Sequence, residues 1–136
     1  MSAGDLTAEE RALRDLLRAW TVLFAAGALN FALLPERTLT TLGHLPGEAL
    51  PREDRFWNAL AVSLMATLTT LCAVAASDVR RHRSFVLPVL VSKAVSSGMY
   101  LLRYAENPRR TSHLAGALCD GSILAVTLRR YRAATR

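Results

Sequence analysis

Two side chains of opposite charge lie inside otherwise uncharged stretches of this sequence. Lys93 is the only charged residue in 84–102, and Asp120 is the only one in 111–128 if His113 is neutral. A lone Lys or Asp at the centre of a lipid bilayer costs on the order of 2.5–3.5 kcal/mol, so such residues are rare and generally face the interior of a helical bundle. The two residues therefore mark a candidate buried site.

The spacing predicts that these two charges meet. Lys93 lies nine residues from position 84, and Asp120 lies eight residues from position 128, each counted from the same end of the predicted bundle. At 1.5 Å per helical residue, their depths agree within about 1.5 Å. The two helices are joined by a short turn marked by Asn107-Pro108, which makes them antiparallel neighbours. We expect an ion pair.

Other polar residues follow the pair at helical spacings of three and four, which place side chains above one another. Gly116 and other small residues would let the two helices approach closely. We call the polar set, completed from the first helix, the polar track: Lys93, Ser96, Ser97, Tyr100, His113, Asp120 and Asn30. Three residues of the second helix could add to a polar interior, namely Asn58, Ser63 and Thr67.

Several interpretations of the pair stay open. It could hold two helices in register, each charge neutralising the other, or it could belong to a binding cavity or proton path for a small or lipophilic ligand. A pairing with a partner subunit is a further possibility. Replacing both charges together separates the first two interpretations.

The elements that must position these residues are four apolar stretches. A bilayer core about 30 Å thick needs about 20 helical residues, and the stretches 19–35, 56–77, 84–102 and 111–128 meet that length. The sequence predicts an all-α fold, a four-transmembrane-helix antiparallel bundle forming one domain over residues 1–136. The alternative is a soluble four-helix bundle, but residues 56–77 lack the polar stripe that it requires.

Local signals set the expected boundaries. Thr7 and Glu10 match a capping box, so a helix begins there, and Pro35 ends the first span. The loop 36–55 could hold a short interfacial helix over 37–45, and residues 78–83 form a tight basic turn. A cleaved signal peptide competes with a retained first helix, but acidic residues mix with the arginines before it, and we favour retention.

The charge distribution predicts the orientation. The formal net charge is +6, and ten arginines lie on the side of the two termini against six on the other side. The positive-inside rule then places both termini in the cytoplasm. Because the arginines gather at span ends, they suit anchoring to the headgroups of the lipid bilayer, and we expect no nucleic-acid partner.

Familiar catalytic motifs are absent from the sequence. There is no GxGxxG, Walker loop or GxSxG elbow. The histidines His44, His82 and His113 lack metal-ligand spacing, and Cys72 and Cys119 are expected to be free thiols. We therefore assign no catalytic residue and no metal site, and the sequence names no cofactor.

The first predicted helix ends in Leu33-Leu34-Pro35-Glu36, a moderately long loop follows, and a basic turn comes after the second helix. Together with four spans in a short chain, this pattern resembles the DoxX-like group of small bacterial membrane proteins. The resemblance implies a multi-pass subunit or accessory protein of the bacterial inner membrane, in some members linked to quinone-dependent redox systems.

Three functional classes follow from these features. The chain could be a small subunit or binding module for a lipophilic small molecule or a membrane protein partner. It could be a membrane enzyme or transporter that uses the polar track between the third and fourth helices. It could also be a scaffold that associates with larger partners through its outer faces.

Overall fold

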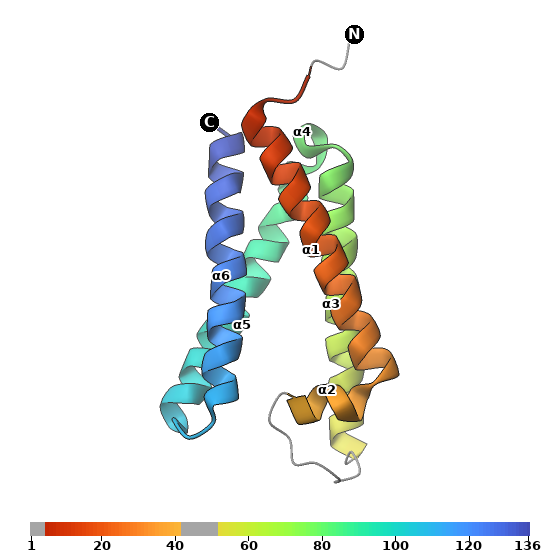
Figure 1. Ribbon diagram of the computed structural model, residues 1–136, viewed down its shortest axis with the longest axis vertical. Coiled ribbons are helices and arrows are strands. Elements are labelled where there is room, and N and C mark those ends of the chain that lie inside the picture. Colours follow the sequence, from red (N-terminus) through yellow and green to blue (C-terminus); the bar gives the residue numbers. More distant parts are fainter. Residues whose placement is uncertain (1–4, 42–51) are drawn as a thin grey trace.

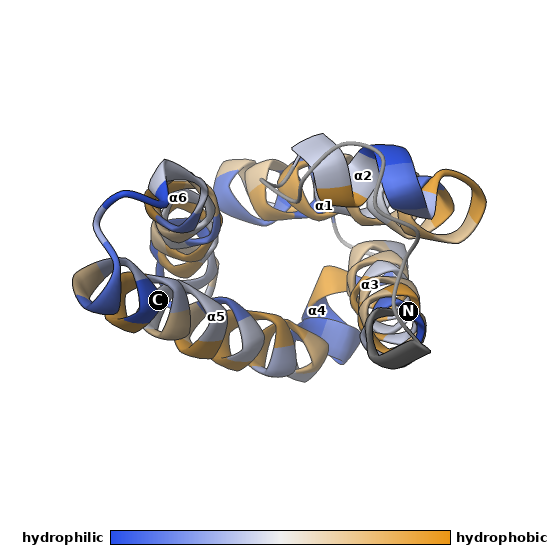
Figure 2. Ribbon diagram, turned by 90° about the horizontal axis from the view of Figure 1, so that it is seen from below, coloured by the Kyte–Doolittle hydropathy of each residue, from blue (hydrophilic) through white to orange (hydrophobic). Residues whose placement is uncertain are grey.

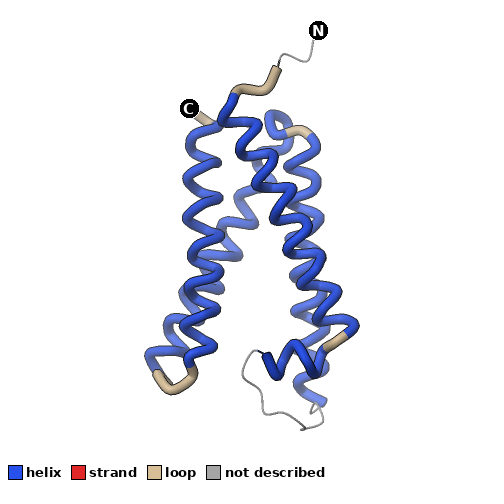
Figure 3. The backbone as a smooth tube through the Cα atoms, in the orientation of Figure 1, coloured by secondary structure: helices blue, strands red, loops and turns tan. Residues whose placement is uncertain are grey.

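The computed structural model describes residues 5–41 and 52–136, and these residues form helices and short connections with no strand among them (Figure 3). The predicted all-α fold is confirmed. In chain order the elements are α1 (Ala8–Leu33), α2 (Pro35–Thr41), α3 (Arg52–Ser77), α4 (Val79–His82), a 3-10 turn (Arg83–Phe85), α5 (Val86–Glu106) and α6 (Thr111–Ala134).

The first helix begins and ends where its local chemistry requires. The Thr7 hydroxyl accepts a hydrogen bond from the Glu10 amide, and the Glu10 carboxylate accepts one from the Thr7 amide, so the predicted capping box is present. At the other end Pro35 disfavours a helical Leu34, and α1 stops at Leu33. Pro35 then opens α2, a position where its missing N–H costs nothing. The expectation that Pro35 ends the first helix is confirmed, and the helix stops two residues before it, inside the predicted stretch 19–35. The expected short helix over 37–45 corresponds to α2 as far as Thr41, and positions 42–45 lie outside the described residues.

The connection over 78–85 is helical, whereas a tight turn was expected. The Asp78 carboxylate accepts hydrogen bonds from the amides of Arg80 (3.1 Å) and Arg81 (3.0 Å), which caps α4. The chain continues through the 3-10 turn, so α5 begins at Val86, two residues after the predicted start. An acidic cap followed by three basic residues therefore makes a short helix that redirects the chain.

The four long helices form two antiparallel hairpins, α1 with α3 and α5 with α6 (Figure 1). The hairpins meet at the end that holds both described chain ends, and they diverge toward the other end. A view along the helices shows the two hairpins facing one another, with α2 lying across the end of its own hairpin (Figure 2).

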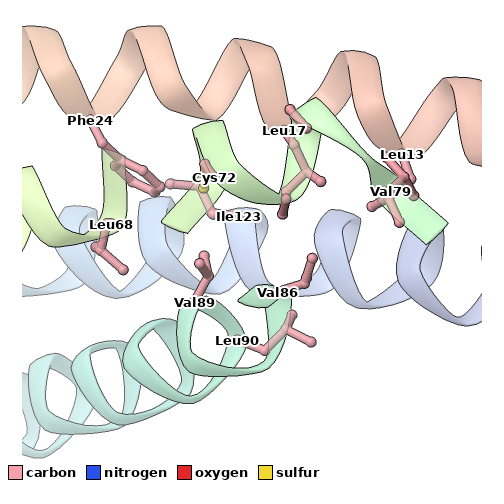
Figure 4. Packing of buried hydrophobic residues seen from close by; sticks show 12 residues of the cluster. Leu13, Leu17, Phe24, Leu68, Cys72, Val79, Val86, Val89, Leu90 and Ile123 are labelled. Carbon is pink, nitrogen blue, oxygen red and sulfur yellow. The ribbon is translucent and has the colours of Figure 1, made fainter. Parts of the chain in front are cut away.

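The hydrophobic core occupies only the part where the hairpins meet (Figure 4). All four long helices and α4 contribute to it: Leu13, Leu17, Phe24, Leu68, Cys72, Ala75, Ala76, Val79, Val86, Val89, Leu90 and Ile123. We call this part the closed half. The open half comprises residues 25–33, 55–67, 94–106 and 111–116, and none of these described residues is buried.

Three of the described helices are long and apolar enough to cross a membrane. They are α1, the part of α3 from Arg55 to Ser77, and the helical run Val79–Glu106. These three match the first three predicted spans. The fourth predicted span, in α6, is not among them, because Asp120, His113 and other polar residues lower the mean hydropathy of the stretch 111–128.

Candidate functional site

The two charges predicted to meet form an ion pair between α5 and α6. The Lys93 ammonium lies 2.9 Å from Oδ1 of Asp120. Lys93 is 4% exposed, and it is the last buried residue along α5. A buried ion pair is costly to desolvate unless further hydrogen bonds satisfy its atoms, so the neighbours of the pair decide whether it is stable.

Two neighbours complete the surroundings of the pair. The Ser96 hydroxyl donates a hydrogen bond to Oδ2 of Asp120, so each carboxylate oxygen has a partner. The ring of Phe24, from the other hairpin, lies with its centroid 4.9 Å from the Lys93 ammonium, a cation–π distance. The site therefore joins α5 and α6 to α1.

Small residues on α6 allow α5 to approach closely beside the pair. A Cβ at Gly121 would lie 3.2 Å from the Ser97 hydroxyl oxygen, and one at Gly116 would lie 3.1 Å from the Tyr100 ring. The Ser97 hydroxyl donates to the Ala117 carbonyl at 3.0 Å. A stripe of small residues with hydroxyl bonds across the helices is how helices associate in lipid, where burial of apolar surface gives little driving force.

The lower part of the polar track lies in the open half. Tyr100 covers Gly116, and its ring centroid is 6.3 Å from that of His113, with the planes tilted by 32°. Neither ring is hydrogen-bonded to Ser97 within the described part of the chain. The track is therefore a row of adjacent polar groups along one helix pair, without a continuous hydrogen-bond chain.

Asn30, the track residue proposed from the first helix, lies elsewhere. Its side chain is exposed on α1, and its backbone carbonyl accepts hydrogen bonds from the Leu34 amide (2.9 Å) and the Thr38 hydroxyl (3.1 Å). Its role is to hold α2 against the end of α1. The structure does not bring its side chain to the other six residues.

The three polar residues proposed from the second helix separate into two groups. Asn58 faces α1, donating from Nδ2 to the Phe31 carbonyl at 3.1 Å, and its buried Oδ1 has no partner among the described residues. Ser63 and Thr67 are exposed and bonded to one another within α3, from the Thr67 hydroxyl to the Ser63 carbonyl. Only Asn58 therefore contributes to a helix interface.

Phe24 is the site residue that sequence reasoning missed. On the sequence it is one of several large apolar residues in the first span, and only the packing of the two hairpins against one another brings its ring to Lys93. The only signal that could have found it is its place at mid-helix, at a depth similar to that of Lys93.

In the part of the chain that the structure describes, no three His, Cys, Asp or Glu side chains lie close enough together to hold a metal ion. Cys72 is buried, Cys119 is exposed, and both are free thiols, as expected from the sequence. His44 lies outside the described residues. The ion pair and its neighbours therefore form the candidate functional site.

No protein-family model, no curated protein and no solved structure matches this chain. The resemblance to the DoxX-like group therefore stays a hypothesis.

Proposed function

We propose that the chain is a four-span protein of the bacterial inner membrane with both termini in the cytoplasm, and that α6 is the fourth span. With 24 residues, α6 is about 36 Å long, enough to cross a bilayer core. Its one acidic residue in the apolar stretch, Asp120, is neutralised by Lys93 and hydrogen-bonded by Ser96. The excess of arginines on the side of the termini supports the orientation.

We further propose that this protein is a small subunit or binding module for a lipophilic molecule or a membrane partner, in keeping with a DoxX-like accessory protein. The observation that carries the proposal is the position of Lys93. It is a buried cation at the boundary between the closed half and the open half, being the last buried residue along α5.

The chemistry of the site defines what it would recognise. An ammonium has three N–H donors, and Asp120 accepts from one of them while the Phe24 ring lies nearby. An oxygen acceptor on a ligand could take a remaining donor. Apolar side chains are exposed in the open half, including Leu29, Leu64 and Met99, and they would contact the rest of an oily molecule. The expected ligand is thus lipophilic with a carbonyl or similar acceptor group.

The test is to remove both charges together, as Lys93→Met with Asp120→Leu, and to purify the protein in a mild detergent. Solvent extraction and mass spectrometry then measure which lipophilic molecules remain bound. We expect the wild type to retain a molecule that the double variant loses while still inserting and folding. The matched control is Arg103→Gln with Glu106→Gln, which removes an exposed ion pair of the same 2.9 Å length.

Retention of the same molecule by the double variant would assign the pair a purely structural role. Purification with a stoichiometric protein partner and no small molecule would favour the subunit or scaffold class instead.

A membrane enzyme or transporter is the second candidate, and the proximity of the Tyr100 and His113 rings, in the open half beyond the pair, favours it. Both rings carry groups able to hold or pass a proton. In proteoliposomes with an internal pH dye, a transporter that uses this row would show a proton flux that His113→Gln abolishes. A binding module would show no flux in either form.

A further inference from the structure

A basic pocket of about 670 Å³ lies at the closed end of the molecule, between α1, the end of α3 and α4. Four arginines line it, Arg14, Arg18, Arg80 and Arg81, against one acidic lining residue, Asp78. In the proposed orientation this pocket faces the cytoplasmic headgroup region of the membrane. Guanidinium groups recognise phosphate through paired N–H donors, so the pocket suits a phosphate group.

The neighbouring acidic groups leave the pocket positive. Asp15 is shared by Arg14 (3.4 Å) and Arg18 (3.8 Å) in exposed contacts, which are weak in water. The Asp78 carboxylate is occupied in capping α4. Arg80 is bound by Glu10, and the Arg81 side chain makes no ion pair with a described residue. An incoming phosphate would therefore meet the guanidinium groups of Arg14, Arg18 and Arg81, which are held only by weak exposed contacts or by no ion pair with a described residue.

A second pocket, of about 350 Å³, continues from the first along the helices. The two pockets share Arg18 and Ser77, so they adjoin. The walls of the second pocket are otherwise small or apolar, formed by Thr21, Val22, Ala73 and Ala76. The small side chains on α3 leave a groove at the surface between α1 and α3, and Val22 is 71% exposed beside it.

The basic pocket at the helix ends continues into an apolar groove. Together they are complementary to an amphiphile, which has a charged headgroup joined to an apolar chain. We propose that this paired pocket binds one anionic phospholipid of the cytoplasmic leaflet, with its phosphate among the arginines and an acyl chain along Ala73 and Ala76. Basic pockets at the cytoplasmic ends of membrane helices bind such headgroups. This inference rests on the proposed membrane location, but it does not involve the site at Lys93.

The experiment is native mass spectrometry of the full chain in mild detergent, with phosphatidylglycerol and phosphatidylcholine of identical acyl chains at equal concentration. We expect the wild type to retain phosphatidylglycerol selectively. The variant Arg14→Gln, Arg18→Gln and Arg81→Gln should lose that retention by about tenfold or more, since each basic residue contributes appreciably to anionic lipid binding. The control variant Arg103→Gln, Arg109→Gln and Arg110→Gln removes the same charge at the opposite end and should behave as the wild type.

A second variant tests the groove. Ala73 is exposed, so Ala73→Trp should fold while filling the groove, and it should weaken phosphatidylglycerol retention with all the arginines in place. Circular dichroism verifies folding of each variant. Equal retention of the two lipids, equal losses in the basic-pocket and control variants, or displacement of the lipid by millimolar inorganic phosphate would each overturn the proposal. The last result would assign the pocket to free phosphates. None of these outcomes depends on Lys93, so failure here is distinguishable from failure of the proposed function.

Discussion

The closed and open halves of this molecule are built from the same four helices but are held together differently. In the closed half large apolar side chains from both hairpins pack into one core, centred on residues such as Leu17 and Val89. In the open half each hairpin makes its own contacts, as between Gly27 and Met65, where a Cβ would lie 3.6 Å from the Met sulfur. The open half has no buried residue of its own among those described.

The polar contacts follow the same division. The hairpins are joined by the Trp20 indole, which donates to the Thr127 hydroxyl at 2.9 Å, by Phe24 against Lys93, and by Glu9 with Arg130 at 3.8 Å. All three contacts belong to the closed half. Among the described residues, the contacts that fix the two hairpins relative to one another therefore lie on one side of Lys93, and the other side has no shared core.

The largest effect is expected from breaking the pair at the boundary of the two halves. Asp120→Leu leaves the buried Lys93 ammonium without its counter-charge, and breaking a buried pair in this way costs about 3–5 kcal/mol. We expect a loss of this size in the free energy of unfolding, measured by denaturant titration in mixed micelles. Lys93→Met combined with Asp120→Leu should recover most of the loss, because no unpaired charge remains.

The exposed pair Arg103 and Glu106 is the control for this prediction. Removing it should cost at most about 1 kcal/mol, because the two charges are solvated. Equal losses from the buried and the exposed pair would show that Lys93 and Asp120 are not buried as described.

Truncation of matched leucines sharpens the comparison between the halves. Leu17 is fully buried in the closed half, and Leu17→Ala should cost about 2–5 kcal/mol of unfolding free energy. Leu64 is 48% exposed in the open half, so Leu64→Ala should cost well under half as much. Thermal unfolding followed by circular dichroism measures both variants, and similar losses would mean that the open half closes into a core of its own.

A smaller effect is expected where a hydrogen bond joins the hairpins. Thr127→Val keeps the shape of a side chain that is 1% exposed but removes the acceptor for the Trp20 indole, which should cost about 1 kcal/mol. The matched change is Thr67→Val, since the Thr67 hydroxyl bonds only within its own helix. Tryptophan fluorescence during denaturant titration measures the unfolding midpoint of both variants. An unchanged midpoint for Thr127→Val would show that the hydrogen bond from the Trp20 indole does not stabilise the fold.

The smallest effect concerns pH at the closed end, before the apolar part of α1. The hydrogen bond from the Arg80 guanidinium, with a further bond from the Thr7 amide, lowers the pKa of Glu10 from 4.5 to about 2. Because the pKa is lower in the folded state, this contribution is complete above about pH 4.5 and is lost as the pH falls toward 2. The melting temperature of the wild type should fall over this interval more than that of Glu10→Gln. Parallel curves for the two proteins would contradict the pKa shift.

The helices and the ion pair could be predicted because their causes are local or periodic. The capping box at Thr7 and the helix-breaking Pro35 act within a few residues, and the depths of Lys93 and Asp120 follow from counting along two antiparallel helices. Ser96 and Ser97 follow from the same periodicity, one bonding Asp120 and the other the backbone of α6.

The rest depends on how the hairpins are placed relative to one another, which a helical period does not encode. The approach of Phe24 to Lys93 is of this kind, and so is the separation of Asn30 from the track. The proposed fourth span is another case, because the cost of placing Asp120 in a bilayer depends on its pairing with Lys93, which the hydropathy of α6 alone does not include. The helical connection after Asp78 was missed because its cap was not recognised among the basic residues.

Thiol labelling tests most directly the claim that α6 crosses the membrane with Asp120 inside it. Cys119 is exposed on the surface of the isolated fold and directly precedes Asp120, so its reactivity measures whether water or lipid surrounds this part of α6. With a membrane-impermeant maleimide on intact bacterial cells, we predict that Cys119 stays unlabelled, that Asn107→Cys is labelled, and that Arg136→Cys is labelled only after permeabilisation. Rapid labelling of Cys119 by the aqueous reagent, or labelling of positions 107 and 136 from the same side, would contradict the account.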